Sequence, residues 1–246
     1  MDRTFEKAKE IVRSAKSLVV LTGAGISQES GIPTFRGEGE HWRGKQFEEL
    51  ATPEAFDEDS RNVWEWYAMR REVVLKCEPN EAHLALARHE QRCRSLNRTF
   101  TLLTQNVDGL HERAGSLNVH RVHGSLWRNR CMQCGEEHWV KQDAESAVVD
   151  QIPTSPCCNA TERPAIVWFG ECLPSKVISI ARLALIRSDA LLVVGTSGCV
   201  VPAANWVFEG LAMGVPVVNV NIDPTNAFPG SIHLTGRATE LVAQLF

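Results

Sequence analysis

The 246-residue sequence lacks several features that would assign a protein to a class at once. It has no apolar run of the roughly 18 residues that a membrane span needs, so no membrane partner is expected. The opening residues MDRTFEKAKEIV are charged and contain no apolar signal-peptide core. The net charge of -4 gives no basic footprint, which argues against direct binding to nucleic acid. Repeats and low-complexity tracts are missing too, and tyrosine occurs once, as Tyr67.

The composition that is present is typical of a soluble globular protein. Hydrophobic residues make up 43% and charged residues 23%, which suffices to bury a full core. Eight cysteines are compatible with disulfides, but a chain with this opening is expected in a reducing cytoplasm. Paired cysteines there more often hold metal than form bridges.

Short apolar runs that end in polar or glycine-rich residues predict the strands of a parallel sheet. These runs are residues 18–21, 100–103, 119–122, 190–194 and 215–220. Helices are expected at residues 5–15, 175–187 and 203–213. Strands that alternate with helices indicate an α/β fold, an open parallel sheet with helices on both faces, as in Rossmann-like domains. In this architecture ligands bind beyond the carboxyl ends of the strands, where the unusual polar clusters of this sequence lie.

Two stretches interrupt the alternation and predict a small second domain. Residues 32–98 form a tryptophan-containing, mostly helical insertion, and residues 125–164 form a zinc-ribbon-like module with four cysteines and His138. The Rossmann-like domain would then consist of residues 1–31, 99–124 and 165–246.

The first polar cluster is the turn Gly23-Ala24-Gly25-Ile26-Ser27 after the first strand. Glycines let main-chain N–H groups approach a phosphate, and the helix start that follows favours negative charge. The dinucleotide fingerprint G-x-G-x-x-G is not present, because Gln28 stands where its third glycine belongs. A plain strand–turn–helix connection explains the glycines equally well.

Two further polar clusters follow later strands. Gln105, Asn106 and Asp108 can hydrogen-bond an amide, a ribose or a water, although Asp108 also fits an Asx-turn that caps the next helix. His123 is a candidate general base, because the pKa of histidine lies near neutrality, but a lone histidine is more often structural.

Four cysteines form a candidate metal site. Cys131-x-x-Cys134 has the spacing of two thiolate ligands on one tetrahedral zinc ion, and two more thiolates would close a structural site. The second half of such a site is usually another C-x-x-C, whereas Cys157 and Cys158 are adjacent. Adjacent cysteines do not easily reach one metal without strain, so a site that has lost full coordination is the alternative.

Taken together, these segments resemble the sirtuin family. Several long motifs coincide in the family's order and cover the chain almost from end to end, which makes the resemblance specific. The matching pieces are GAGISQESGIPTFRG (23–37), TQNVDGLHERAG (104–115), HGS (123–125), the cysteine module, RPAIVWFGE (163–171), GTSGCVVPAA (195–204) and NID (221–223).

The resemblance implies an enzyme that consumes NAD as a co-substrate and removes acyl groups from lysine side chains of proteins or peptides. The acyl oxygen attacks the nicotinamide ribose, nicotinamide leaves, and the products are O-acyl-ADP-ribose and free lysine. His123 would be the catalytic base, with Asn106 and Asp108 as further catalytic residues. The implied cofactor contacts are Gly23, Ala24, Gly25, Phe35, Arg36, Gln105, Asn106, Val107, Asp108, Gly195, Thr196, Ser197, Asn221 and Ala238.

A structural zinc ion, one per chain, is also implied by the resemblance. Its ligands would be Cys131, Cys134, Cys157 and Cys158. When the motifs are anchored on Arg163, the family's third ligand cysteine falls at Ser155. Either Cys157 substitutes for it with altered geometry, or zinc is weakly held or absent.

Substrate residues follow from the same resemblance. Tyr67 and Arg70 are three residues apart and share a face of an expected helix, where a hydroxyl and an arginine fork suit a carboxylate. This placement resembles the desuccinylase branch of the sirtuins, which favours succinyl or malonyl as well as acetyl groups; a solvated arginine beside a packed aromatic is the alternative. An edge to which the substrate main chain adds as a strand would be formed by Val167, Trp168, Phe169 and Gly170.

Two other functions fit parts of the sequence. The same cleavage of NAD would make an ADP-ribosyltransferase if ADP-ribose passed to another nucleophile, but an intact His123 together with Tyr67 and Arg70 favours deacylation. A non-catalytic NAD-sensing module would bind NAD without releasing nicotinamide, but none of the catalytic segments is degraded.

Overall fold

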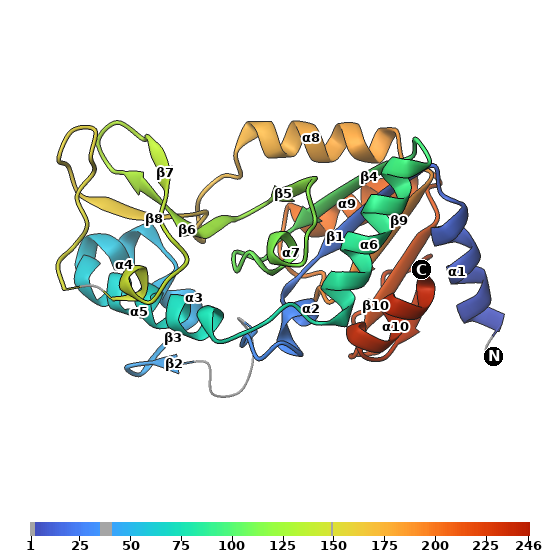
Figure 1. Ribbon diagram of the computed structural model, residues 1–246, viewed down its shortest axis with the longest axis horizontal. Coiled ribbons are helices and arrows are strands. Elements are labelled where there is room, and N and C mark those ends of the chain that lie inside the picture. The colour runs from blue at the N-terminus through green and yellow to red at the C-terminus, as the bar shows by residue number, and fades with distance from the viewer. Residues whose placement is uncertain (1–2, 35–40, 149) are drawn as a thin grey trace.

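The computed structural model describes residues 3–34, 41–148 and 150–246 of the chain. Its larger part is a six-stranded sheet in which all neighbouring strands are parallel. From edge to edge the strands are β11 (Ile232–Thr235), β10 (Val217–Asn221), β9 (Ala190–Val194), β1 (Ser17–Thr22), β4 (Thr99–Thr104) and β5 (Val119–Arg121) (Figure 1). The five apolar runs of the sequence are five of these strands. The sixth, β11, is not predicted, because it is a short edge strand with mostly half-buried side chains.

Helices cover both faces of this sheet. Those that share one hydrophobic core with it are α1 (Arg3–Ser14), α6 (Glu81–Ser95) and α10 (Ala238–Leu245). Those that share a second core with it are α8 (Ser175–Ile186) and α9 (Ala203–Ala212). The predicted Rossmann-like architecture is confirmed. None of the described helices has the length and apolar composition needed to cross a membrane.

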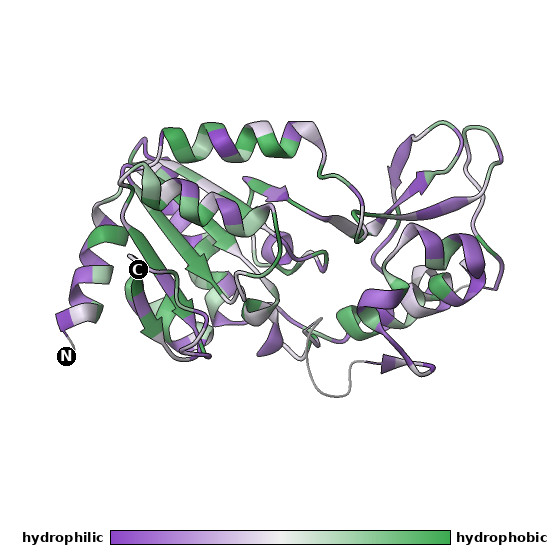
Figure 2. Ribbon diagram, turned by 180° about the vertical axis from the view of Figure 1, so that it is seen from behind, coloured by the Kyte–Doolittle hydropathy of each residue, from purple (hydrophilic) through white to green (hydrophobic). Residues whose placement is uncertain are grey.

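The strands are buried on both faces, which explains their nearly continuous hydrophobic runs. In β1, Leu18 and Val20 belong to the core that contains α1, α6 and α10. Val19 and Leu21 alternate with them and belong to the core that contains α8 and α9. Figure 2 shows the strands of the large sheet as hydrophobic, with helices of mixed character around them.

The smaller part lies to the left in Figure 1 and combines helices, a two-stranded hairpin and a three-stranded antiparallel sheet. Its elements are α3 (Phe47–Leu50), α4 (Pro53–Glu58), α5 (Ser60–Leu75), the 3-10 helix η1 (Glu145–Ala147), and the strands β2 (His41–Trp42), β3 (Lys45–Gln46), β6 (Gly124–Cys131), β7 (Glu137–Trp139) and β8 (Glu162–Ile166). Its core is rich in aromatic side chains, including Trp64, Trp66, Tyr67 and Trp127.

The helix α6 lies within the 32–98 insertion but packs on the large sheet. Ala82, Ala85 and Leu86 form an apolar face at helical spacing and are buried in the same core as β1 and β4. The predicted domain boundary at residue 98 places α6 in the small part, although its apolar face is buried in the core of the large part.

Candidate active site

The carboxyl ends of the parallel strands meet at a cavity of about 490 Å³. Loops after β1, β4, β9 and β10 line it from the larger part, and residues of α5 line it from the smaller part. This is the position at which open α/β sheets bind their ligands. The predicted site residues that line it are Gly23, Ala24, Gly25, Arg70, Gln105, Asn106, Val107, Asp108, His123, Val167, Trp168, Phe169, Gly170, Gly195, Thr196, Ser197 and Asn221.

The turn after β1 is in main-chain contact with the turn after β9. The N–H of Gly23 donates to the carbonyl oxygen of Val194 at 3.0 Å, and the N–H of Gly25 donates to that of Gly195 at 2.8 Å. A Cβ atom on Gly25 would lie 2.8 Å from the Cα of Gly195, which itself has a φ of +63°. The close approach of two main chains therefore requires glycine here. The short helix α2 (Ala24–Gln28) begins in this turn.

Ser27 joins the first two polar clusters of the sequence. Its hydroxyl donates to Oδ2 of Asp108 at 2.9 Å and accepts a hydrogen bond from Nδ2 of Asn106 at 3.0 Å. The same amide nitrogen donates to the carbonyl oxygen of Gly23 at 3.0 Å. All three side chains are buried, so the loop after β4 is held rigidly against the turn after β1.

Asp108 caps a helix and lines the cavity at the same time. Its Oδ1 accepts the N–H of Leu110 at 2.8 Å, which is the Asx-turn that the sequence suggests at the start of α7 (Leu110–Arg113). Gly109, in this turn, has a φ of +86°. Burial raises the pKa of the Asp108 carboxyl, while hydrogen bonds from Leu110 and Ser27 lower it in part.

His123 lies just beyond β5 and lines the cavity. Its Nδ1 lies 3.1 Å from the main-chain carbonyl oxygen of Gln105. Because a carbonyl oxygen only accepts, Nδ1 carries the proton and Nε2 carries the lone pair. Burial lowers the pKa of His123, and the bond to Gln105 raises it in part. A neutral imidazole of this tautomer is suited to take up a proton inside the cavity.

Two side-chain amides tie the loop after β9 to its neighbours. Gln105 donates through Nε2 to Oγ1 of Thr196 at 3.1 Å, and Asn221 donates through Nδ2 to the carbonyl oxygen of Thr196 at 2.8 Å. Ser197 lines the cavity beside them. Residues from β4, β9 and β10 therefore present one connected polar wall.

Residues 167–170 form the wall that follows β8. The N–H of Val167 donates to the carbonyl oxygen of His123 at 3.0 Å, and that of Phe169 donates to a main-chain oxygen after α3 at 2.9 Å. The N–H of Trp168 donates to Oε2 of Glu171 at 2.8 Å. Within the described part of the chain, the carbonyl oxygens of Val167 and Phe169 accept no such bond.

Tyr67 and Arg70 are neighbours on α5, as their spacing predicts. The Arg70 guanidinium lies 5.6 Å from the centre of the Tyr67 ring, and Arg70 lines the cavity. Tyr67 has no exposed surface, and its hydroxyl oxygen accepts a hydrogen bond from Nε1 of Trp168 at 2.8 Å. Burial raises the pKa of Tyr67 to about 12, so the hydroxyl keeps its proton at neutral pH.

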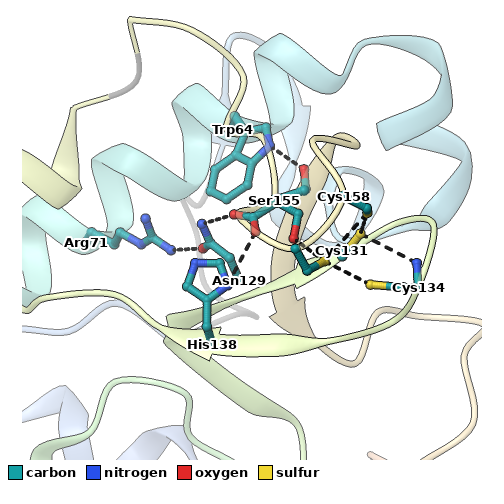
Figure 3. A network of polar contacts seen from close by, with 10 residues as sticks. Trp64, Arg71, Asn129, Cys131, Cys134, His138, Ser155 and Cys158 are labelled. Carbon is teal, nitrogen blue, oxygen red and sulfur yellow. Dashed lines mark hydrogen bonds and ion pairs between the residues drawn. The ribbon is translucent and has the colours of Figure 1, made fainter.

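The four predicted zinc ligands lie together, with their sulfur atoms all within 4.8 Å of one another (Figure 3). The sulfurs of Cys131 and Cys158 are 3.3 Å apart, and those of Cys134 and Cys157 are 3.1 Å apart. The N–H of Cys134 lies 3.5 Å from the Cys131 sulfur and, with the neighbouring Cys158 thiol, lowers the pKa of Cys131, which favours the thiolate that zinc binds. The four thiols are placed to bind one tetrahedral zinc ion.

The adjacent cysteines reach this cluster because the chain turns sharply after them. The N–H of Asn159 donates to the carbonyl oxygen of Ser155 at 2.8 Å, and Asn159 has a φ of +57°. The Ser155 hydroxyl lies 3.0 Å from the sulfur of Cys157. The sequence predicts difficulty for adjacent ligands, but the structure brings the sulfurs of both Cys157 and Cys158 into the cluster.

A buried polar chain beside the cysteines connects α5 to the antiparallel sheet (Figure 3). Arg71 donates to Oδ1 of Asn129 at 2.8 Å, and Asn129 donates to Oε2 of Glu162 at 2.9 Å. His138 pairs with Oε1 of Glu162 at 3.3 Å and does not join the cysteine cluster. Burial lowers the pKa of Arg71 to about 10, which leaves it charged at neutral pH.

Comparison with known proteins assigns this architecture to a family. The model of the Sir2 family matches residues 23–202 of the sequence. The chain belongs to the Sir2 family. A relative from the zebrafish Danio rerio, NAD-dependent protein deacylase sirtuin-5, mitochondrial, is 42% identical over 241 residues, which cover 89% of this chain and 78% of that protein.

Solved Sir2 structures have the same fold. A complex of a Sir2 homologue with NAD has a TM-score of 0.88 and 41% identity, and the match covers 100% of this chain and 92% of that one. A complex of Sir2 with a p53 peptide and NAD+ has a TM-score of 0.83 and 28% identity, and the match covers 100% and 97% of the two chains.

Some of the contacts that the Sir2 resemblance implies are not brought to the cavity. Ala238 begins α10, packs in the core of the large sheet and is not among the described residues that line the cavity. Phe35 and Arg36 lie outside the described residues.

Two buried polar residues of this Sir2 site are not singled out by the sequence. Ser27 stands inside a glycine motif that is interpreted for its main chain, yet its hydroxyl organises Asn106 and Asp108. His83 lies behind it, with Nε2 at 3.4 Å from the Ser27 hydroxyl, and burial lowers the pKa of His83 to about 4. The sequence feature that could have pointed to His83 is its position three residues after Asn80, the N-cap of α6, where a capping-box side chain is expected.

Proposed function

We propose that this Sir2-family chain is an NAD-dependent protein-lysine deacylase. The observation that carries the proposal is the position of His123, whose neutral imidazole is fixed by Gln105 in the cavity that Asn106 and Asp108 also line. Acylated lysine and NAD would be converted to free lysine, nicotinamide and O-acyl-ADP-ribose. The zebrafish relative is named as an enzyme of this kind, and NAD is bound in the Sir2 homologue complex.

Each wall of the cavity has a part in this reaction. The turn of Gly23, Ala24 and Gly25 would lie along the pyrophosphate. The residues Gly195, Thr196 and Ser197 would lie along the adenosine, with Asn221 near its ribose.

The groups on the opposite wall would act at the reacting ribose. Asn106 and Asp108, locked in place through Ser27, would orient the nicotinamide and its ribose. NAD, when bound, supplies the ribose carbon to which the acyl oxygen becomes joined. His123 would take a proton from a ribose hydroxyl through Nε2, which has the lone pair.

The acyl groups accepted would include succinyl and malonyl besides acetyl. Arg70 lines the cavity from α5 with Tyr67 directly beside it, and a guanidinium is the side chain best suited to hold a carboxylate. The peptide main chain would add along residues 167–170. A Sir2 complex with a p53 peptide supports a protein or peptide substrate.

Zinc would be a structural ion held by the four cysteines, without a role in the chemistry. A cytoplasmic location is also part of the proposal. It accords with eight cysteines none of which forms a disulfide, although the zebrafish relative is named mitochondrial.

Mass spectrometry of acylated peptides tests the function. A lysine peptide with an acetyl or a succinyl group is incubated with the protein, with and without NAD. Appearance of the free-lysine peptide only when NAD is present supports the proposal. A peptide that stays acylated, or that gains ADP-ribose in place of losing its acyl group, contradicts it.

A further inference from the structure

One buried hydrogen bond links Trp168, which lines the cavity in the segment 167–170, to Tyr67 on α5. The indole Nε1 of Trp168 lies 2.8 Å from the hydroxyl oxygen of Tyr67, across 101 positions of sequence. Both side chains are buried, with exposed fractions of 2% and 0%. Trp168 lines the cavity and Tyr67 lies behind it, beside Arg70.

The direction of this bond is fixed by chemistry. An indole N–H is a donor only, so the oxygen of Tyr67 must be the acceptor. The proton of the Tyr67 hydroxyl then has to point elsewhere, and within the described residues the hydroxyl donates to no other group. The guanidinium of Arg70 cannot accept it. The proton of the Tyr67 hydroxyl is therefore available to a ligand that accepts a hydrogen bond.

The indole of Trp168 is itself held from several directions. The guanidinium of Arg163 lies 3.3 Å from the centre of its ring, and the ring of Phe56 packs at 5.3 Å. Arg163 donates two hydrogen bonds to the Glu171 carboxylate, at 2.6 and 2.9 Å, and that carboxylate accepts the N–H of Trp168. The position of the indole N–H is thus set by the partly buried Arg163–Glu171 ion pair and by packing.

We propose that Trp168 is a positioning residue for acyl selectivity, which directs the Tyr67 hydroxyl proton to the carboxylate of an acidic acyl group. A carboxylate can only accept hydrogen bonds, so it needs donors. Arg70 attracts it to α5, and the Tyr67 hydroxyl, which accepts the N–H of Trp168, has its proton free to serve as one more donor. Because the Tyr67 side chain has no exposed surface, the acyl group must displace neighbouring side chains to reach its hydroxyl. The inference rests on the proposed function.

The test uses the full chain with NAD and two versions of one lysine peptide, succinylated and acetylated. The quantity measured is the ratio of kcat/KM for the succinyl peptide to kcat/KM for the acetyl peptide. Effects on peptide binding, folding or the concentration of active enzyme are shared by both substrates and cancel in this ratio. Trp168→Phe keeps an aromatic ring and removes the N–H, and we expect the ratio to fall about two- to ten-fold.

A double-mutant cycle isolates the hydroxyl. Tyr67→Phe alone lowers the ratio about ten-fold, because one donor to the carboxylate is lost. Adding Trp168→Phe in the Tyr67→Phe background then causes no further fall, since no hydroxyl remains to be oriented.

Trp64→Phe is the matched control. Trp64 is also fully buried, and its Nε1 donates to the carbonyl oxygen of Glu162 at 3.0 Å, on the side of α5 that faces the cysteine module (Figure 3). The Trp64→Phe variant loses the same kind of indole hydrogen bond. The succinyl-to-acetyl ratio of kcat/KM stays at the wild-type value in this variant if the fall is specific to Trp168. If Trp168→Phe yields no folded protein, benzothienylalanine at position 168 replaces the N–H by sulfur and keeps the shape.

The outcomes separate this inference from the proposed function. If the wild-type protein leaves the succinyl peptide intact in the presence of NAD, the proposed acyl range fails and this inference fails with it. If the wild type removes succinyl and Tyr67→Phe lowers the ratio, but Trp168→Phe leaves it unchanged, the role of Trp168 is overturned and the proposed function stands.

Discussion

His123 holds its Nδ1 at 3.1 Å from the main-chain carbonyl oxygen of Gln105, and this one contact sets the chemistry that the imidazole can perform. The proton stays on Nδ1 and the lone pair is on Nε2. Gln105 also donates a hydrogen bond to Thr196, so the residue that fixes the imidazole is itself fixed by the loop after β9. The proposed base, His123, and the proposed cofactor contact Thr196 are therefore parts of one hydrogen-bonded structure.

The tautomer and burial of His123 predict the pH dependence of the reaction. Burial lowers the pKa of His123 below the ordinary histidine value of about 6.5. A base must be unprotonated, so kcat/KM should already be at its plateau at pH 7 and should fall as pH drops through the lowered pKa. A pH profile of deacylation checks this. An acidic limb with a midpoint above about 7 would show that His123 is not the group that titrates.

The contact between the two glycine turns predicts a large cost for a methyl group at Gly195. Its φ of +63° disfavours any side chain, and a Cβ would lie 2.5 Å from the nitrogen of Ile26. Gly214 is the matched control, because its φ is +77° but a Cβ there meets nothing within 4 Å. Gly214→Ala should cost about 1–2 kcal/mol from backbone strain alone. Gly195→Ala should cost about 1–3 kcal/mol more in urea unfolding and should raise KM for NAD; equal losses would show that the turns do not need their close approach.

The cysteine cluster predicts about one zinc ion per purified chain. Cys131→Ser should remove most of it, because Cys131 is the buried member of the cluster. Cys172→Ser, which changes an exposed free thiol outside the cluster, should leave the zinc content unchanged. A chelator should lower the Tm of the wild type, since binding of a structural metal is coupled to folding. Elemental analysis that finds almost no zinc in the wild type would show that the site with Ser155 has lost its metal.

The position of Arg70 in the lining of the cavity predicts that this residue determines the preference for acidic acyl groups. Arg70→Met should lower the succinyl-to-acetyl ratio of kcat/KM by about 10–150-fold, because a charge-assisted hydrogen bond to the carboxylate is lost. Arg70→Lys should restore little of it, since an ammonium cannot bind both carboxylate oxygens as a planar fork does. Arg61→Met, which breaks an exposed ion pair with Glu65 on the same helix, should not change the ratio. A succinyl-to-acetyl ratio that Arg70→Met leaves unchanged would show that Arg70 does not bind the carboxylate of the acyl group.

The large sheet could be predicted from the sequence because its strands are buried on both faces. A run such as that of β9 has one apolar residue after another, and polar loops mark where each strand ends. β11 escapes the same reasoning, because an edge strand with half-buried side chains has no such pattern. The helix α6 within the insertion could not be assigned to a domain from the sequence. Its apolar face predicts that it is buried, but not in which of the two hydrophobic cores.

The candidate site could be predicted as a set of motifs but not as a network. Motif order placed Asn106, Asp108 and His123 at one end of the sheet, and the structure brings them to one cavity. The role of Ser27 depends on a distance across two loops, and that of Trp168 on a residue 101 positions away. Such contacts are set by the packing of the folded chain and leave no periodic signal in the sequence.

The central claim is that this chain couples lysine deacylation to the cleavage of NAD with His123 as the base. The most direct measurement follows the products of a succinylated lysine peptide with NAD by mass spectrometry, for the wild type and for His123→Ala. The wild type should form free-lysine peptide, nicotinamide and O-succinyl-ADP-ribose in equal amounts. His123→Ala should keep the wild-type fold and lose about 10²–10⁴-fold in the rate of peptide release. Succinate set free without consumption of NAD, or near-normal peptide release by a folded His123→Ala, would contradict the account.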